Sequence, residues 1–153
     1  MRRERRFHVP AVWGALALVW LWSAPARADL SKAMAEPDLE KRSGLALANA
    51  AAAFETARAA YDKGDNAQVA AAAAEIQESV DLAAASLKQT GKNARKHPKW
   101  FKKAEIESRD LLRKLDAFQQ AMGYSDRAML GQVTARVQKV HDEWLDELLE
   151  GGK

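Results

Sequence analysis

Apolar residues recur at steps of three and four along most of the chain, the spacing that gathers side chains on one face of an α-helix. The stretch after Pro98 is the most regular and predicts a helix with one continuous apolar face. Three other stretches, which begin near Pro37, Asn66 and Ser125, have the same periodicity. The four predicted faces contain Leu47, Ala50, Ala51, Phe54, Ala57 and Tyr61; Val69, Ala72, Ala73, Ile76, Val80, Ala83 and Leu87; Trp100, Phe101, Ala104, Ser108, Leu111, Leu112, Leu115, Phe118 and Met122; and Leu130, Val133, Val137, Val140, Trp144 and Leu148.

Glycine and proline residues separate these stretches. Gly64, Gly91 and Gly123 end the first three helices, and Pro98 suits the first turn of the third. Ser125 is a candidate N-cap for the fourth. The connections are short, which favours antiparallel packing of neighbours, and no run after the first 28 residues has the alternation of a strand. The sequence therefore predicts an all-α fold, an antiparallel up-and-down four-helix bundle made of two helical hairpins.

The first 28 residues have the three parts of a secretory signal peptide. A start rich in arginine is followed by an apolar run and then by small residues. Ala26 and Ala28 form the small-x-small pattern that a signal peptidase recognises, which places the cut before Asp29. The apolar run is shorter than the ~20 residues of a spanning helix, so we expect no stable membrane span after cleavage.

These features divide the chain into three parts. We expect a signal-peptide helix over residues 1–28, a flexible segment over residues 29–37, and one helical-bundle domain over residues 38–150. The expected location of the product is the bacterial periplasm or the extracellular space.

The distribution of charge and the cysteine content reduce the number of possible functions. The chain has 24 basic and 21 acidic residues, but five of the basic and one of the acidic residues lie in the predicted signal peptide. The remainder has an excess of one acidic residue, so the net charge gives no support for nucleic-acid binding. The absence of cysteine excludes disulfides, a thiolate nucleophile and cysteine-bound zinc.

Two segments resemble known proteins. Residues 59–65, with the sequence Ala-Ala-Tyr-Asp-Lys-Gly-Asp, resemble the turn between the two helices of a tetratricopeptide unit. Val69 departs from that family's small residue and no 34-residue repeat follows, so a peptide-binding solenoid is not implied. Residues 86–106 resemble a group of uncharacterised, predicted secreted helical proteins of bacteria. That resemblance implies a helical fold and no activity.

Catalytic and metal-binding patterns are weak. His97 and His141 have no glutamate three residues before them, as a di-iron bundle site requires. The carboxylates near residues 75–81 and 142–150 have the pattern of solvated faces, and the chain has no Gly-x-Ser-x-Gly turn. We therefore expect no enzymatic activity, no cofactor and no metal. An envelope enzyme or a metal-binding bundle that uses carboxylates and His141 is the alternative.

A basic segment is the one unusual surface feature. Residues 88–114 carry ten basic and three acidic side chains. Lys102, Ile106, Arg109 and Arg113 follow at helical spacing and form one ridge that points away from the predicted core. An ordinary solvated face is the simpler interpretation, because exposed ion pairs contribute only ~0–1 kcal/mol. The candidate binding residues are Lys92, Arg95, Lys96, Lys99, Lys102, Lys103, Ile106, Arg109 and Arg113.

These observations lead to a binding function as the first hypothesis. We expect an exported, non-enzymatic interaction protein whose basic edge contacts an anionic partner, either a protein or an anionic component of the cell envelope. A self-assembling structural protein, in which acidic and basic regions of different copies meet, is a further alternative.

Overall fold

The computed structural model describes residues 28–150, and the predicted signal peptide lies outside this range except for its last residue. Within that range the chain forms helices joined by turns and contains no strand, which confirms the all-α prediction. The five helices are α1 (Ala28–Ala35), α2 (Leu39–Asp62), α3 (Asn66–Gln89), α4 (Pro98–Ala121) and α5 (Ala128–Glu150).

The ends of the long helices follow local chemistry. The Asp38 carboxylate caps α2 by accepting hydrogen bonds from the backbone N–H groups of Glu40 and Lys41, at 3.0 and 3.1 Å. Asp65 caps α3 in the same way. Gly64 lies between the two helices at φ 72°, a conformation in which a side chain would be strained.

The start of α5 differs from the prediction. Ser125 does not cap the helix: its hydroxyl donates to the Asp126 carboxylate at 3.1 Å, and α5 begins three residues later, at Ala128. The turn is instead attached to the end of α2. The Tyr61 hydroxyl donates to Asp126 Oδ2 at 3.0 Å and accepts the N–H of Gly123 at 2.9 Å.

Helix α1 was not predicted. The sequence analysis assigned residues 29–37 to a flexible segment, but residues 28–35 form two turns of helix that pack on α2. Leu30 and Ala33 are buried there, with exposed fractions of 9% and 0%. The prediction failed because a helix this short has too few apolar positions to show a periodicity, and its burial comes from α2.

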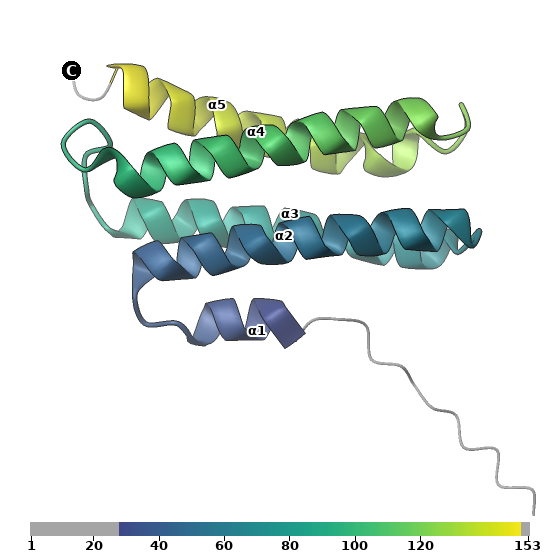
Figure 1. Cartoon of the computed structure of the whole chain (residues 1–153), viewed down its shortest axis with the longest axis horizontal. Helices are drawn as coiled ribbons and strands as arrows, with labels where there is room; N and C mark the ends of the chain where they lie inside the picture. Colours follow the sequence, from purple (N-terminus) through teal and green to yellow (C-terminus); the bar gives the residue numbers. More distant parts are fainter. Residues whose placement is uncertain (1–27, 151–153) are drawn as a thin grey trace, which may run out of the picture.

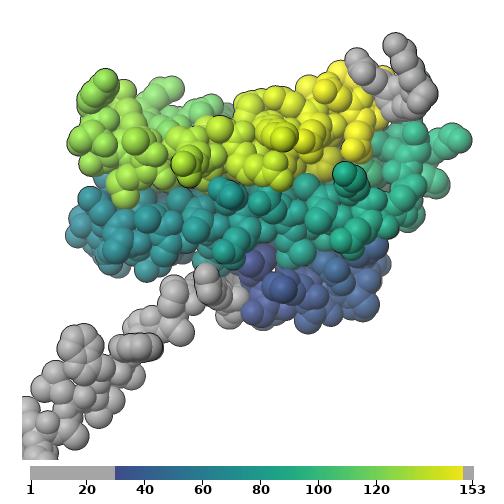
Figure 2. All heavy atoms as spheres, turned by 180° about the vertical axis from the view of Figure 1, so that it is seen from behind, coloured from purple at the N-terminus to yellow at the C-terminus, as the bar shows by residue number. Residues whose placement is uncertain are grey.

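The long helices form two hairpins that lie one above the other (Figure 1). Helix α2 packs on α3, and α4 packs on α5. Between the hairpins, α2 contacts α4 and α3 contacts α5, while α1 lies on the far side of the α2–α3 hairpin. Seen from behind, α5 runs along α3 over its length (Figure 2).

Helices that face each other across the two hairpins run in the same direction. Near the start of α2, Gly44 lies beside Trp100, and near its end Tyr61 packs edge-on against Phe118 with ring centroids 5.6 Å apart. Arg136 of α5 donates to Asp81 of α3 at 2.6 Å. Consecutive helices are antiparallel neighbours within each hairpin, whereas α3 and α4, which also follow each other in the chain, contact each other little.

The reason for this arrangement is the connection between the hairpins. The connection formed by residues 90–97 is longer than the α2–α3 and α4–α5 turns. It takes the chain across the molecule from α3 to a position above α2. Ala94 is buried in this connection, and the N–H of His97 donates to the Asn93 carbonyl at 2.9 Å. A longer link removes the constraint that consecutive helices must be neighbours.

The core lies where the periodicity placed it. Ile76, Leu87, Leu115 and Val137 are among the largest fully buried side chains. Exceptions are Ala51, Tyr61, Trp100 and Leu148, which are partly exposed at the edges.

The side-chain amide of Asn49 is among the polar groups buried between the helices of the first hairpin. Asn49 donates from Nδ2 to Ser79 Oγ at 2.9 Å and to Glu75 Oε1 at 3.0 Å. A buried amide is costly unless it is hydrogen-bonded, so this contact favours one register of α2 against α3.

The core assignment predicts a large effect at Leu115. Leu115→Ala removes a side chain with no exposed surface and should lower the free energy of unfolding by about 2–5 kcal/mol. Chemical denaturation measures this difference. Leu45→Ala, at a position 43% exposed on α2, is the control and should lower it much less. Equal losses for the two variants would contradict the core assignment.

Candidate functional site

His141 lies in the core contact between α4 and α5. Its Nδ1 is 3.1 Å from Ser108 Oγ, and the Ser108 hydroxyl donates to the Glu105 carbonyl at 2.9 Å. A serine nucleophile needs a histidine that accepts its proton and an oxygen that substrate can reach. Ser108 is fully buried, so its oxygen is not accessible in this structure, and the pair joins two helices within the core.

The carboxylates do not form a metal site in the described part of the chain. No three histidine, aspartate or glutamate side chains of residues 28–150 lie close enough together to bind a metal ion. Asp142 and Asp146 on α5 are exposed, and Asp81 is paired with Arg136. The described residues therefore contain no group of side chains arranged for the metal-binding alternative.

The structure divides the predicted basic segment between two faces. Three of its lysines lie toward α2: Lys92 pairs with Glu40 at 2.8 Å, and the amino groups of Lys99 and Lys103 lie 5.4 and 5.3 Å from the centre of the Trp100 ring. These cations already have partners within the molecule. Lys96 is exposed in the connection before α4.

The remaining predicted residues lie on the opposite side of α4. Arg95, Lys102, Ile106 and Arg109 line a hollow of about 480 Å³ between α4 and α5 on the outer face of this hairpin. Arg113 lies beside Ile106 and Arg109 and pairs with Asp110. The ridge predicted from helical spacing is therefore present, and it forms one wall of a groove.

The floor of this groove is apolar. Ile106 is 53% exposed and Leu149 is 69% exposed, and both line the hollow. Leu145 and Leu148 of α5 complete the floor. A second hollow of about 490 Å³ shares Arg109 and continues the groove toward Gln120 and Gln138.

Two of the cations around the groove have no partner. Among the described residues, the side chains of Arg95 and Lys102 take part in no ion pair or hydrogen bond. Arg109 is held by Glu105 at 3.6 Å. Exposed leucine and isoleucine side chains thus lie beside cations that have no partner among the described residues.

The outward side of α5, next to the groove, was not found from the sequence. Asp142, Asp146 and Leu149 follow one another at steps of four and three on the side of α5 that points away from the core, and all three are exposed. The spacing is visible in the sequence, but the acidic cluster there was interpreted as a solvated helix end. Its position opposite the basic ridge depends on how α4 and α5 pack.

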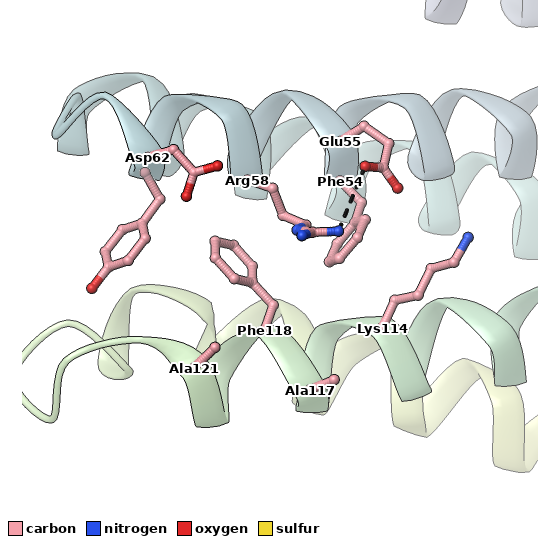
Figure 3. Close-up of a pocket in the computed structure, with 9 residues that line it drawn as sticks. Phe54, Glu55, Arg58, Asp62, Lys114, Ala117, Phe118 and Ala121 are labelled. Atoms are coloured by element: carbon pink, nitrogen blue, oxygen red, sulfur yellow. Dashed lines mark ion pairs between the residues drawn. The ribbon is translucent and has the colours of Figure 1, made fainter.

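A separate hollow of about 320 Å³ lies between α2 and α4 (Figure 3). Phe54 and Phe118 form its base, and Arg58 and Lys114 reach over it from opposite helices. Arg58 pairs with Glu55 at 4.0 Å, and Lys114 shares the Asp110 carboxylate with Arg113, so both cations have acidic partners on their own helices. Sequence analysis did not find this hollow, because its walls come from helices that are distant in the chain.

One acidic side chain of α4 is partly buried toward α2. Desolvation raises the pKa of the Glu107 carboxyl above its ordinary value, and the Lys103 ammonium, 3.7 Å from Oε1, opposes this shift only in part. Glu107 Oε2 is buried and accepts no hydrogen bond. A buried oxygen without a partner is a local cost to the folded state when the group is ionised.

A comparison with protein-family models gave no match for this chain, and comparisons with curated proteins and with solved structures gave none either. The resemblances to a tetratricopeptide turn and to secreted helical proteins therefore rest on the residues quoted for them. None of the five described helices is long and apolar enough to cross a membrane.

The burial of Glu107 predicts a pH-dependent effect of its substitution. A carboxyl with a raised pKa in the folded state stabilises the fold while it is protonated, and this contribution is lost as the pH rises through the raised value. We therefore compare the melting temperature of Glu107→Gln with that of the wild type at two pH values. The difference should favour the variant more at neutral pH than in acid. Thermal unfolding followed by circular dichroism measures both differences.

The exposed Glu78 provides the control for this prediction. Glu78→Gln should change the melting temperature by nearly the same small amount in acid and at neutral pH. A Glu107→Gln difference that does not vary with pH would show that burial of this carboxyl does not matter for stability.

Proposed function

We propose that this protein is an exported, non-enzymatic interaction protein that binds an anionic partner at the outer face of the α4–α5 hairpin. The observation that carries the proposal is the presence of Arg95 and Lys102 without partners beside an apolar floor that contains Ile106 and Leu149. An apolar surface surrounded by charge is typical of a protein-interaction site. The cations favour a partner with carboxylates or other anionic groups.

The arrangement of the helices supports this choice of face. The four long helices form one domain, residues 38–150, which we describe as a four-helix bundle made of two stacked hairpins. Helix α1 covers part of the outer side of the first hairpin, where it buries Leu30 and Ala33. The outer side of the second hairpin has no such cover among the described residues, and its leucine and isoleucine side chains remain exposed.

Export through a cleaved signal peptide is part of the proposal. Cleavage before Asp29 would leave all of α1 except its first residue in the product. The buried Leu30 and Ala33 would therefore stay with the domain. The product would act in the periplasm or outside the cell.

The export proposal predicts a defined N-terminus. When the full chain is expressed with a tag after Lys153 in a bacterium, the purified product should begin at Asp29. Intact-mass measurement of the product recovered outside the cytoplasm checks this. Ala28→Gln should block processing, because it places a large side chain where the peptidase requires a small one. Retention of residues 1–28 in the wild-type product would contradict the prediction.

The binding proposal predicts selective loss of an anionic partner. Arg95, Lys102, Arg109 and Arg113 are changed together to glutamine, and the variant is compared with the wild type in a pull-down from envelope extract. The wild type should retain a protein, lipid or polymer at low salt that the variant does not retain. Retention should weaken as salt screens the charges.

A matched control removes the same number of charges from the other face. In this control Lys92, Lys96, Lys99 and Lys103 are changed to glutamine, and it should retain the same material as the wild type. If the two variants behave alike, the outer groove is not the binding surface. Both variants should first give the wild-type helical circular dichroism spectrum.

A further inference from the structure

The two helices that border the groove on the outer face of the α4–α5 hairpin carry opposite charges on their outward sides. Lys102, Arg109 and Arg113 lie on the α4 side. On the α5 side the groove is lined by leucines, and beyond them Asp142 and Asp146 are exposed on the side of the helix that points away from the core. Asp142 accepts a hydrogen bond from Gln138 at 2.7 Å, and the Asp146 side chain has no partner among the described residues. An occupant of this groove must therefore present acidic groups to one wall and basic groups to the other.

A second copy of the chain meets this requirement. We infer that two copies associate through this face, about a two-fold axis parallel to the helices, so that α4 of each copy lies on α5 of the other. This inference rests on the proposed binding surface and names its partner. A two-fold interface brings the same patch of both molecules together, so a patch with one basic and one acidic ridge can be complementary to itself.

The register within the hairpin aligns the opposite charges. Ser108 contacts His141, and Gln119 accepts a hydrogen bond from Thr134 at 3.2 Å. These two contacts place Arg109 and Asp142 at nearly the same height along the hairpin. Lys102 and Asp146 lie within about one helical turn of each other, or ~5 Å, which is within reach of a lysine side chain.

A rotation about an axis parallel to the helices keeps every height unchanged. Arg109 of one copy therefore lies opposite Asp142 of the other, and Lys102 opposite Asp146, with each pair formed twice. The helices that meet, α4 of one copy and α5 of the other, run antiparallel. Between the charged ridges, Ile106 and Leu149 of both copies would be removed from water.

The apolar floor provides the attraction and the ridges provide the specificity. Burial of exposed leucine and isoleucine favours association in proportion to the area removed from water. Charge pairs at the edge of an interface chiefly select the partner and its orientation, because like charges placed opposite each other are strongly unfavourable. Reversal of one charge should therefore prevent pairing of identical copies.

The experiment reverses one charge on each ridge, separately and together. Sedimentation equilibrium of the purified exported protein should show a dimer for the wild type. Lys102→Glu places a carboxylate opposite Asp146 of an identical copy, and Asp146→Lys places two ammonium groups together, so each variant should dissociate with a Kd raised about tenfold or more. The double variant restores opposite charges and should dimerise again.

Mixing the two single variants gives the sharpest result. In a mixed pair, the carboxylate introduced by Lys102→Glu faces the ammonium group introduced by Asp146→Lys. The unchanged Asp146 of the first variant faces the unchanged Lys102 of the second, so both contacts are favourable. The two monomeric proteins should associate when combined, which no folding defect can explain. Lys63→Glu, in the exposed α2–α3 turn, is the control and should dimerise as the wild type does.

The possible outcomes distinguish a failure of this inference from a failure of the proposed function. A wild type that stays monomeric at all concentrations overturns the second-copy assignment, and so does a mixture of the single variants that fails to associate. In either case the pull-down still decides whether the groove binds a different anionic partner. Retention of anionic lipid vesicles by a monomeric wild type would identify a membrane surface in place of a second copy.

Discussion

Burial of apolar side chains between the two hairpins is the interaction on which the described structure depends. The chain has no cysteine, so no disulfide contributes to its stability. The buried stripes include Ile76 and Val80 of the first hairpin and Leu115 and Val137 of the second. Because a stripe must face the core, it fixes the rotation of each helix about its own axis and thereby decides which residues face outward. The ridge of Lys102, Ile106 and Arg109 is a consequence of this constraint.

The two hairpins contribute differently to the core. Helices α2 and α3 bury many alanines, which let their backbones approach closely but remove little area per residue from water. Helices α4 and α5 supply larger side chains, such as Phe118 and Trp144. Tyr61 links the hairpins at one end, since its ring packs on Phe118 and its hydroxyl contacts the α4–α5 turn. This contact helps hold α4 in the same direction as α2.

The same packing divides the basic residues into two groups, one directed toward α2 and one on the outer side of the α4–α5 hairpin. Lysines directed toward α2 have partners within the molecule: Lys92 is paired with Glu40 of α2, and the other two lie over Trp100 of their own helix. Cations on the outer side border an apolar groove, and beyond its leucines exposed aspartates lie on the outward side of α5. A surface of this kind favours a partner that has both charges in the complementary order. That condition is more selective than a general attraction to anions, and a second copy of the chain is the partner that we infer.

The sequence by itself determined the helical class, most of the helix boundaries, the buried stripes and the outward ridge of α4. These features depend on interactions between residues close in the chain: periodicity, glycine at a turn and proline in a first turn. Tertiary structure alone decided that α2 and α4 are neighbours, that α1 is a helix packed on α2, and that Asp142 and Asp146 lie on the same outer face as the basic ridge. Each of these depends on contacts between segments brought together by folding, and the link over residues 90–97 permits more than one way of stacking two hairpins. Local spacing therefore predicts which face of a helix is buried, but not which helix covers it.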